Sequence, residues 1–288
     1  MQTYCGLMKI NNIWKIYFSA TGTTEKVVSA IANQLVKCSD KLETEKNVHS
    51  ETFDFTLPSA RNSFPEIAPN DLVVFGVPTY AGRVPNLLLK YLDSIQGNGA
   101  LAVPVVTFGN RAFDNALIEL RNILENHGFK TIAAGAFVCE HSFSYTLAAG
   151  RPDENDLALA KDFAETIYNK LSKIDLNLYK HEPILVDGDE NAGYYQPKTD
   201  EGTPIDIRKV KPKTNVNCTK CGTCAKICPM GSISFVDFSI VSGVCIKCGA
   251  CIKKCPARAK YFDDAGYLYH KAQVERNFAR PADNKIFI

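Results

Sequence analysis

Hydrophobic and polar positions follow two different periods along residues 1–171. Short, nearly continuous apolar runs have the length and composition of strands. Between them lie longer stretches whose apolar residues recur every three or four positions, as on one face of a helix. The predicted strands are Ile13–Phe18, His49–Phe55, Asp71–Val77, Leu101–Phe108 and Thr131–Cys139. The predicted helices are Thr24–Val36, Pro85–Ile95, Asp114–Asn126 and Asp153–Leu171, with Asp114 as an N-cap.

This order of elements predicts an α/β fold with a doubly wound parallel sheet of five strands over residues 1–171. The connection between the second and third strands is the exception to the alternation. Pro58, Pro65 and Pro69 lie within it, and prolines disfavour a full helix there.

Residues 172–213 form a linker of mixed character. Scattered glycines and prolines prevent any long element, but the segment is not a flexible Gly/Ser chain. Tyr194 and Tyr195 predict that it packs on a domain, and the aromatic and apolar tail Phe278–Ile288 is also expected to dock. The short strands expected in the linker are Pro183–Val186 and Ile205–Val210.

Two cysteine runs near the C-terminus carry the strongest chemical signal. They are Cys218-x2-Cys221-x2-Cys224-x3-Cys228-Pro229 and Cys245-x2-Cys248-x2-Cys251-x3-Cys255-Pro256, offset by 27 residues. This is the spacing of 4Fe–4S ligands, in which three cysteines converge on one cubane. The fourth cysteine, beside a rigid proline, ligates the other cluster. Residues 214–288 are therefore predicted to form a small α+β ferredoxin domain with two 4Fe–4S clusters.

The predicted ligand sets combine three cysteines of one run with the last cysteine of the other. They are Cys218, Cys221, Cys224 and Cys255, and Cys245, Cys248, Cys251 and Cys228. Zinc is the main alternative, but it has no use for a third cysteine at this spacing or for the proline. A disulfide scaffold is disfavoured because the chain shows no secretory signal. The remaining cysteines, Cys5, Cys38 and Cys139, are scattered and are interpreted as structural or incidental.

Composition and charge place the chain among globular proteins. Its 288 residues are 45% hydrophobic, and no apolar stretch reaches the ~18 residues of a membrane span, so a cytoplasmic location is expected. Residues 211–288 hold 13 basic and 5 acidic side chains. The excess offsets the negative clusters or forms a docking face for an acidic redox partner protein. No aromatic-plus-basic motif accompanies it, which argues against nucleic-acid binding.

The loops after the predicted strands carry a second signal. Ser19–Thr24, with the sequence S-A-T-G-T-T, opens a helix, where backbone N–H groups, hydroxyls and the helix dipole favour a phosphate. An ordinary Ser/Thr-capped helix is the alternative. Two further loops, Gly76–Pro85 and Thr107–Phe113, are expected to gather beside it at the switch point of the sheet. Their glycines, polar donors and aromatic rings fit a flat heterocycle with a phosphate tail.

These motifs resemble those of the flavodoxin family, and more closely those of flavodoxin–ferredoxin fusion proteins. The resemblance rests on S-A-T-G-T-T, G-V-P-T-Y-A-G-R-V-P, F-G-N-R, K-P-K-T and both cysteine runs. It implies a flavodoxin-like domain that binds FMN. The implied phosphate contacts are Ser19, Ala20, Thr21, Gly22, Thr23 and Thr24. The implied contacts to the flavin ring are Thr79, Tyr80, Ala81 and Gly82, then Gly109, Asn110 and Arg111 on the pyrimidine side, with Pro78, Phe108 and Phe113 beside them.

The implied function is electron transfer. Each cluster carries one electron and FMN carries one or two, so the chain would relay electrons between a redox partner, two clusters and FMN. The alternative is an FMN-dependent reductase of a quinone, nitro compound or enone, fed through its ferredoxin domain. Tyr80, His141 and Arg111 are the candidate catalytic residues for that alternative. Each also has a purely structural interpretation, such as an ion pair for Arg111.

Overall fold

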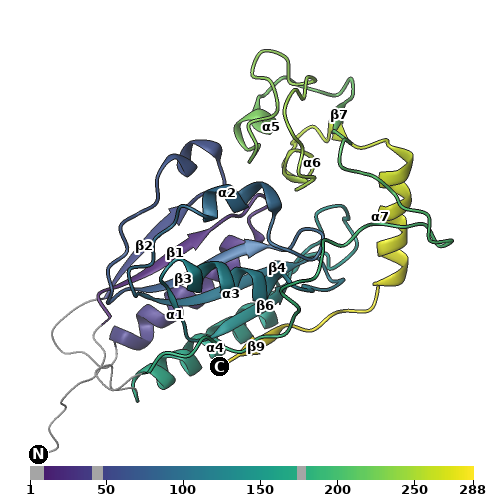
Figure 1. The fold of residues 1–288 in the computed structure, drawn as a ribbon. Coiled ribbons are helices and arrows are strands. Elements are labelled where there is room, and N and C mark those ends of the chain that lie inside the picture. The colour runs from purple at the N-terminus through teal and green to yellow at the C-terminus, as the bar shows by residue number, and fades with distance from the viewer. Residues whose placement is uncertain (1–9, 41–47, 174–179) are drawn as a thin grey trace, which may run out of the picture.

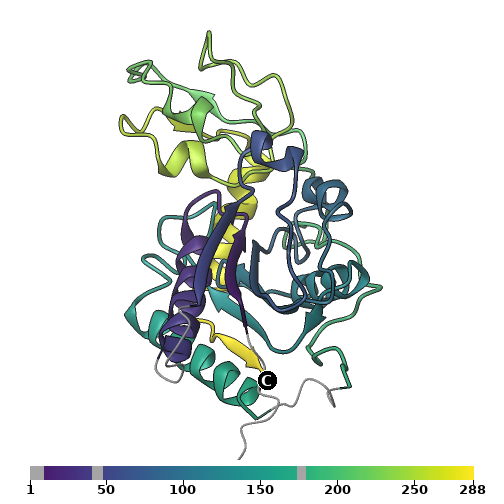
Figure 2. The same ribbon diagram turned by 90° about the vertical axis from the view of Figure 1, so that its left-hand side faces the viewer.

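The structure is a computed structural model that describes residues 10–40, 48–173 and 180–288, so Cys5 lies outside the described residues. The chain forms an α/β lobe and a smaller lobe that holds both cysteine runs. The smaller lobe sits above the α/β lobe in Figures 1 and 2. The long helix α7 (Ala265–Asn277) leads from it back towards the sheet, as Figure 1 shows.

The α/β lobe is built on a parallel sheet with the strand order β2-β1-β3-β4-β6. Its strands are β1 (Asn12–Tyr17), β2 (His49–Asp54), β3 (Leu72–Pro78), β4 (Leu101–Phe108) and β6 (Ala134–Val138), and the short β5 (Lys130–Thr131) pairs with the start of β4. When β5 and β6 are counted as one strand, this is the flavodoxin-like order 2-1-3-4-5. The predicted fold class is confirmed, and the order reverses between β1 and β3.

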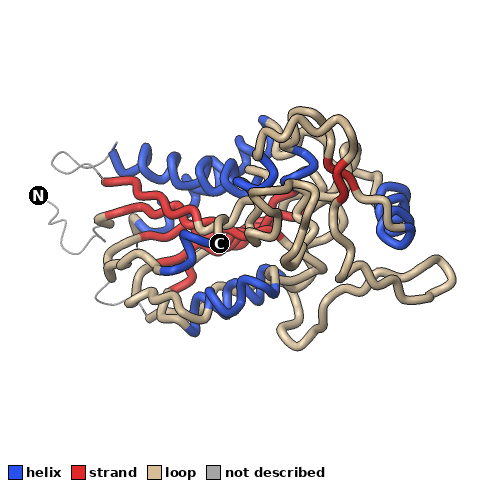
Figure 3. The backbone as a smooth tube through the Cα atoms, turned by 90° about the horizontal axis from the view of Figure 1, so that it is seen from above, coloured by secondary structure: helices blue, strands red, loops and turns tan. Residues whose placement is uncertain are grey.

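Helices cover both faces of the sheet, as Figure 3 shows from above. The helices α1 (Thr23–Asp40) and α4 (Glu154–Leu171) lie together on one face. The short α2 (Leu89–Leu92) and α3 (Ala116–Asn126) cover the other face. The apolar stripe predicted for the first helix is buried, including Val27, Ile31 and Leu35. Each such side chain contributes about 1.5–3 kcal/mol to the free energy of folding.

Two predicted elements of the α/β lobe differ in the structure. The helix expected over Pro85–Ile95 is reduced to a 3-10 turn, Asn86–Leu88, and the four residues of α2. The strand expected over Thr131–Cys139 is split into β5 and β6. The break falls beside Pro104 of β4, which has no N–H to donate to a neighbouring strand.

The predicted N-cap of α3 is wrong. Asn115 occupies that position, and its side-chain oxygen accepts a hydrogen bond from Asp189 N instead of capping the helix. Asp114 has a positive φ of 42° and forms an ion pair with Arg111. The carboxylate is therefore used to close the loop before the helix.

The linker forms neither of the strands predicted over Pro183–Val186 and Ile205–Val210. Its backbone hydrogen bonds go elsewhere, which explains the difference. Tyr195 N donates to Ala81 O at 2.8 Å, and the chain folds on itself where Thr199 N donates to Thr203 O at 2.8 Å. The linker therefore packs on the α/β lobe.

The smaller lobe shows the internal repeat of the cysteine runs in its backbone. Lys220 and Lys247 have φ of 57° and 56°, and Gly222 and Gly249 have φ of 77° and 75°. The repeat also produces two matching short helices. The elements of this lobe are β7 (Lys213–Thr214), α5 (Thr223–Lys226), α6 (Ala250–Lys253) and β8 (Lys260–Tyr261).

The end of the chain returns to the first lobe. Beyond α7, strand β9 (Lys285–Phe287) pairs antiparallel with β6 at the edge of the sheet. The side chain of Asn110 holds the segment before β9, donating to Phe278 O at 2.6 Å and accepting from Ala282 N at 3.0 Å. The smaller lobe is thus tied to the sheet on both sides, by the linker and by the tail.

Candidate functional site

The loop between β1 and α1 has the properties of an anion cradle. Ser19 Oγ accepts a hydrogen bond from Glu25 N at 3.0 Å, and Ser19 N donates to Thr56 Oγ1 at 2.7 Å. Among the described residues, the backbone N–H groups of Ala20–Thr24 donate to no acceptor. Gly22, with φ of +94°, turns the chain between them. Open N–H groups at the start of a long helix are suited to a phosphate group.

The loop after β3 holds a buried hydroxyl group without a partner. Tyr80 and Arg83 exchange backbone hydrogen bonds of 2.9 and 3.1 Å around Ala81 and Gly82, whose φ values of 50° and 76° belong to a type I′ turn. Thr79 Oγ1, just before this turn, is buried and has no hydrogen-bond partner in the described part of the chain. Such an orphaned group is costly unless a ligand satisfies it. A flavin carbonyl or ring nitrogen would fit this need.

The loop after β4 is engaged with other parts of the same chain. The Asn110 side chain holds the returning tail, as described above. The Arg111 guanidinium pairs with Asp114 and lies 4.2 Å above the ring centre of Tyr195 in the linker. Arg111 therefore forms an ion pair, which is the structural interpretation that the sequence left open for it. The predicted contacts of both residues with a flavin stay predictions.

The loop after β6 brings His141 against the loop after β4. A Cβ atom added to Gly109 would lie 2.4 Å from the His141 ring, so only glycine permits this approach. His141 Nδ1 accepts a hydrogen bond from Phe143 N at 3.1 Å. Burial, with the nearby Lys253, His270 and Arg111 charges, lowers the pKa of His141 to about 3. The imidazole is therefore neutral at physiological pH and is a poor general acid.

Four cysteines surround one small apolar cavity in the smaller lobe. Its walls include Cys228, Cys245, Cys248 and Cys251, together with Phe262. Burial, with the charges of Cys245 and Cys228, raises the pKa of the Cys248 thiol to about 12. These are the four residues of one predicted ligand set, drawn from both runs. We call them the inner cysteine site, and their arrangement fits a single 4Fe–4S cluster.

The other predicted set, which we call the outer cysteine site, lies nearer the surface. It comprises Cys218, Cys221, Cys224 and Cys255. Cys224 is buried and Cys221 is exposed. Burial raises the pKa of the Cys224 thiol, and the Cys218 charge adds to this shift. Ala259 N donates to Cys255 Sγ at 3.3 Å, as Ser232 N does to Cys228 Sγ at 3.4 Å. Such N–H bonds to sulfur tune cluster potentials.

The second cysteine run docks on the loop after β6. A Cβ atom on Gly249 would meet Ser142 O at 2.4 Å, so the two backbones touch. Lys253 Nζ pairs with Glu140 and donates to His141 O at 2.6 Å. These contacts bring the inner cysteine site to the carboxyl edge of the sheet, where the β1, β3 and β4 loops also end.

Tyr80 lies between that edge and the inner cysteine site. Burial raises the pKa of its hydroxyl well above the usual value, and the charges of Cys248 and Cys245 raise it further. Those charges act on Tyr80 because the β3 loop faces the second cysteine run. The family resemblance implies a contact of Tyr80 with the flavin ring, but nothing in the sequence links Tyr80 to these cysteines.

Sequence reasoning missed the docking role of Lys253. In the sequence this lysine belongs to the basic excess of residues 211–288, which is interpreted as offsetting the clusters or as a docking face for a redox partner, and not as a contact within the chain. A signal was present, because Lys226 and Lys253 occupy equivalent positions in the two runs. Only the presence of Glu140 beside one of them distinguishes their roles.

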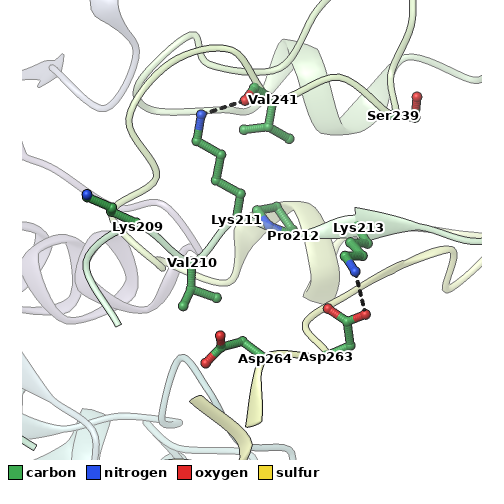
Figure 4. Close-up of a pocket in the computed structure, with 9 residues that line it drawn as sticks. All are labelled: Lys209, Val210, Lys211, Pro212, Lys213, Ser239, Val241, Asp263 and Asp264. Carbon is green, nitrogen blue, oxygen red and sulfur yellow. Dashed lines mark hydrogen bonds and ion pairs between the residues drawn. The ribbon is translucent and has the colours of Figure 1, made fainter. Parts of the chain in front are cut away.

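A surface pocket of about 490 Å³ lies elsewhere, between the linker and the smaller lobe (Figure 4). Lys211 Nζ donates to Val241 O at 2.8 Å, and Lys213 pairs with Asp263 at 2.7 Å. Two of the three lysines that line the pocket are therefore engaged within the protein. The pocket includes none of the predicted cluster or flavin residues.

No helix in the described ranges combines the length and apolar character needed to cross a membrane. Within the same residues, no three His, Cys, Asp or Glu side chains are grouped to hold a single metal ion. That finding concerns one ion, whereas a cubane spreads four ligands around four irons.

Two sequence families match the smaller lobe, and both are described as 4Fe-4S binding domains. One match covers residues 217–231, and the other covers residues 238–261. Each match contains one complete cysteine run. The matches support iron–sulfur clusters in this lobe. No curated protein matches the chain.

Solved flavodoxin structures are similar to the α/β lobe. An archaeal flavodoxin shares 15% identity, with 56% of this chain and 98% of that chain covered and a TM-score of 0.37. Flavodoxin 1 from Bacillus cereus shares 16% identity, with 55% and 97% covered and a TM-score of 0.36. A Fusobacterium nucleatum flavodoxin mutant bound to flavin mononucleotide shares 19% identity, with 58% and 99% covered and a TM-score of 0.35. At these values, the flavodoxin-like topology rests on the strand order itself.

Proposed function

For a chain that joins a flavodoxin-like lobe to 4Fe-4S binding domains, we propose an electron-transfer iron–sulfur flavoprotein. It relays electrons between a redox partner, two 4Fe–4S clusters and FMN, and so couples one-electron with two-electron steps. The observation that carries the proposal is the docking of the inner cysteine site on the carboxyl edge of the sheet. Gly249 touches Ser142 there, and Lys253 pairs with Glu140.

The residues present fit both kinds of group. The inner cysteine site supplies four thiols around one cavity. The β1–α1 loop offers the open N–H groups of Ala20–Thr24 to a phosphate, and Thr79 offers an unpartnered hydroxyl to the ring. When bound, the clusters supply one-electron steps and FMN supplies one- or two-electron steps. The protein contributes fixed positions and exclusion of water.

A packed aromatic path connects the two ends of the site. Phe262 lines the inner cysteine cavity, and its ring centre lies 4.2 Å from that of Tyr267. The ring centre of Tyr267 is 4.7 Å from that of Phe143, and the ring centre of Phe143 is 5.2 Å from that of His141. His141 in turn touches Gly109 in the β4 loop. Close packing without an intervening solvent layer favours rapid electron transfer across the interface.

Two of the three candidate catalytic residues favour a relay over a dedicated reductase. Arg111 is paired with Asp114. His141 accepts a backbone hydrogen bond and stays neutral. Tyr80 lies near Cys248 and Cys245 of the inner cysteine site, and burial raises the pKa of its hydroxyl group well above the usual value. The Arg111 and His141 side chains are thus occupied within the protein.

Anaerobic preparation and stepwise reduction test the proposal. We expect about eight irons and one FMN per chain, because two clusters hold four irons each. We also expect flavin absorbance to bleach only after cluster absorbance has begun to fall, when a low-potential donor reacts at the outer site. Zinc in place of iron, or no binding of FMN by the apoprotein, contradicts the proposal.

A further inference from the structure

The two cysteine runs carry lysines at matching positions. Lys220 and Lys226 in the first run correspond to Lys247 and Lys253 in the second, 27 residues further along. The backbone conformation also matches, with φ of 57° at Lys220 and 56° at Lys247. The same local structure therefore presents two lysine ammonium groups beside each run.

In the second run both lysines are bound by other parts of the chain. Lys247 is buried and donates to Arg208 O in the linker at 2.5 Å and to Cys245 O at 2.8 Å. Lys253 pairs with Glu140 of the α/β lobe and donates to neighbouring carbonyl groups. This run thus shows what its lysines can bind: a carboxylate and backbone carbonyls at the edge of a redox domain.

In the first run the equivalent lysines face solvent. Lys220 and Lys226 are exposed, and neither ammonium group forms a hydrogen bond or an ion pair with a described residue. Between them lies Cys221, the exposed cysteine of the outer site. The outer site therefore offers the same cationic pattern without the protein surface that covers it at the inner site.

An exposed apolar tip lies next to these lysines. Val236 is 97% exposed and Phe235 is 65% exposed. The same loop packs against the first run. A Cβ atom built on Gly222 would lie 3.3 Å from the Phe238 ring. Asp237 is the acidic group of this loop, and hydrogen bonds from Ser239 lower its pKa, with a smaller contribution from the Lys220 charge. Apolar residues beside charged ones have the anatomy of a protein interface.

We propose that an acidic redox protein docks on the first run, with a carboxylate on Lys226 and apolar surface on the Phe235–Val236 tip. It would use Lys226 as the α/β lobe uses Lys253. This inference rests on the proposed function. One electron passes between the partner's redox centre and the outer cluster, so one centre is oxidised and the other reduced, and no bond forms or breaks. Acidic partners fit because residues 211–288 carry 13 basic and 5 acidic side chains.

The test uses a small acidic bacterial ferredoxin, chemically reduced, as the probe donor. Stopped-flow absorbance measures the second-order rate of electron transfer to the intact protein under anaerobic conditions. At low salt, Lys226→Glu should lower this rate about tenfold and Lys226→Gln about threefold, since steering charges act mainly on association. The matched control is Lys161→Glu, an exposed lysine on α4, which should change the rate less than about twofold.

Salt separates the charged part of the surface from the apolar part. At about 0.5 M salt the Lys226 variants should approach the wild-type rate, because exposed charges are screened. Val236→Ser should lower the rate about threefold at both salt concentrations, because it removes apolar contact. Equal losses for Lys226→Glu and Lys161→Glu would overturn the proposal.

Cross-linking gives a readout that does not depend on electron transfer. A zero-length carbodiimide should join a ferredoxin carboxylate to Lys226 or Lys220, and peptide mass mapping locates the link. Links found only on the α/β lobe contradict the docking site. Iron analysis and spectra of every variant separate the two proposals. If clusters and FMN are present, but the variants leave the rate unchanged and no cross-link maps to the first run, only this inference fails. If clusters are absent, the proposed function fails as well.

Discussion

Lys253, two residues beyond the third cysteine of the second run, forms an ion pair with Glu140 in the loop after β6. Its ammonium group also donates to His141 O at 2.6 Å and to Ser144 O at 2.8 Å. An ammonium group has three donors, so each of them has an acceptor here. The second run is thereby attached to the loop after β6, at the edge of the sheet where a flavin site is expected. The separation of the two redox sites is thus set by packed contacts and does not depend on a flexible linker.

Lys253→Gln should weaken the attachment of the smaller lobe. Removal of the ammonium group leaves the largely buried Glu140 carboxylate without its charged partner, which lowers the unfolding free energy by about 2–3 kcal/mol. Urea unfolding under anaerobic conditions measures this cost, and limited proteolysis should release the α/β lobe sooner. Lys254→Gln is the matched control, because the neighbouring lysine is exposed and its loss should cost less than about 0.5 kcal/mol. Equal stability of the two variants would refute the attachment.

Single serine substitutions should distinguish the two ligand sets. Cys228→Ser removes a ligand from the inner site although it lies in the first run, and Cys255→Ser does the reverse for the outer site. We expect each variant to lose one cluster, or about four irons, while keeping the other. Electron paramagnetic resonance of the reduced proteins identifies the remaining cluster. Cys139→Ser, at a buried cysteine outside both sites, should keep both clusters. The swapped ligation is wrong if Cys228→Ser affects the outer cluster alone.

Thr79→Val should affect stability and flavin binding in opposite directions. The Thr79 hydroxyl group is buried without a partner, so its removal should leave unfolding free energy unchanged or raise it by about 1 kcal/mol. If the hydroxyl group binds the flavin, FMN affinity should fall about fivefold to tenfold. Fluorescence titration of the apoprotein with FMN measures the affinity. Thr131→Val is the control, because that hydroxyl group already bonds Glu125 and its loss should cost stability alone. Unchanged FMN affinity in Thr79→Val removes Thr79 from the site.

His141 should make the protein less stable in acid. Its folded-state pKa of about 3 lies below the ordinary value near 6.5, so only the unfolded chain takes up a proton between these values. Stability is therefore lost as pH falls from about 6.5 towards 3. At pH 5.5 this loss is about 1.4 kcal/mol. His141→Gln should not show this loss. The unfolding free energy of the wild type minus that of the variant, measured in urea, should therefore fall by about that amount between pH 7.5 and pH 5.5. A constant difference would show that His141 does not titrate as proposed.

Much of the fold follows from local pattern. The apolar run Leu101–Phe108 forms β4 with the predicted bounds, and Asp153 caps α4, because burial of one face and a side-chain cap are decided within a few residues. Pro104 lies in β4 but interrupts the strand that pairs with it, so β5 and β6 are separate. Asn115 replaces Asp114 at the N-cap of α3, because Asp114 pairs with Arg111 and the Asn115 side chain binds the linker. Such competition involves residues far apart in sequence and leaves no local signal.

The cysteine spacing by itself determined the chemistry of the smaller lobe, because three thiols two residues apart and a fourth beside proline suit a cubane. It could not determine which run faces the sheet. Both runs have a glycine directly after the second cysteine and a lysine two residues after the third, and the two glycines have nearly the same φ. Only the folded chain distinguishes them: Ser142 and Glu140 lie against Gly249 and Lys253, whereas Lys226 is left facing solvent. The physical reason is that a repeat has equal local energies, and contacts with the rest of the molecule decide between its copies.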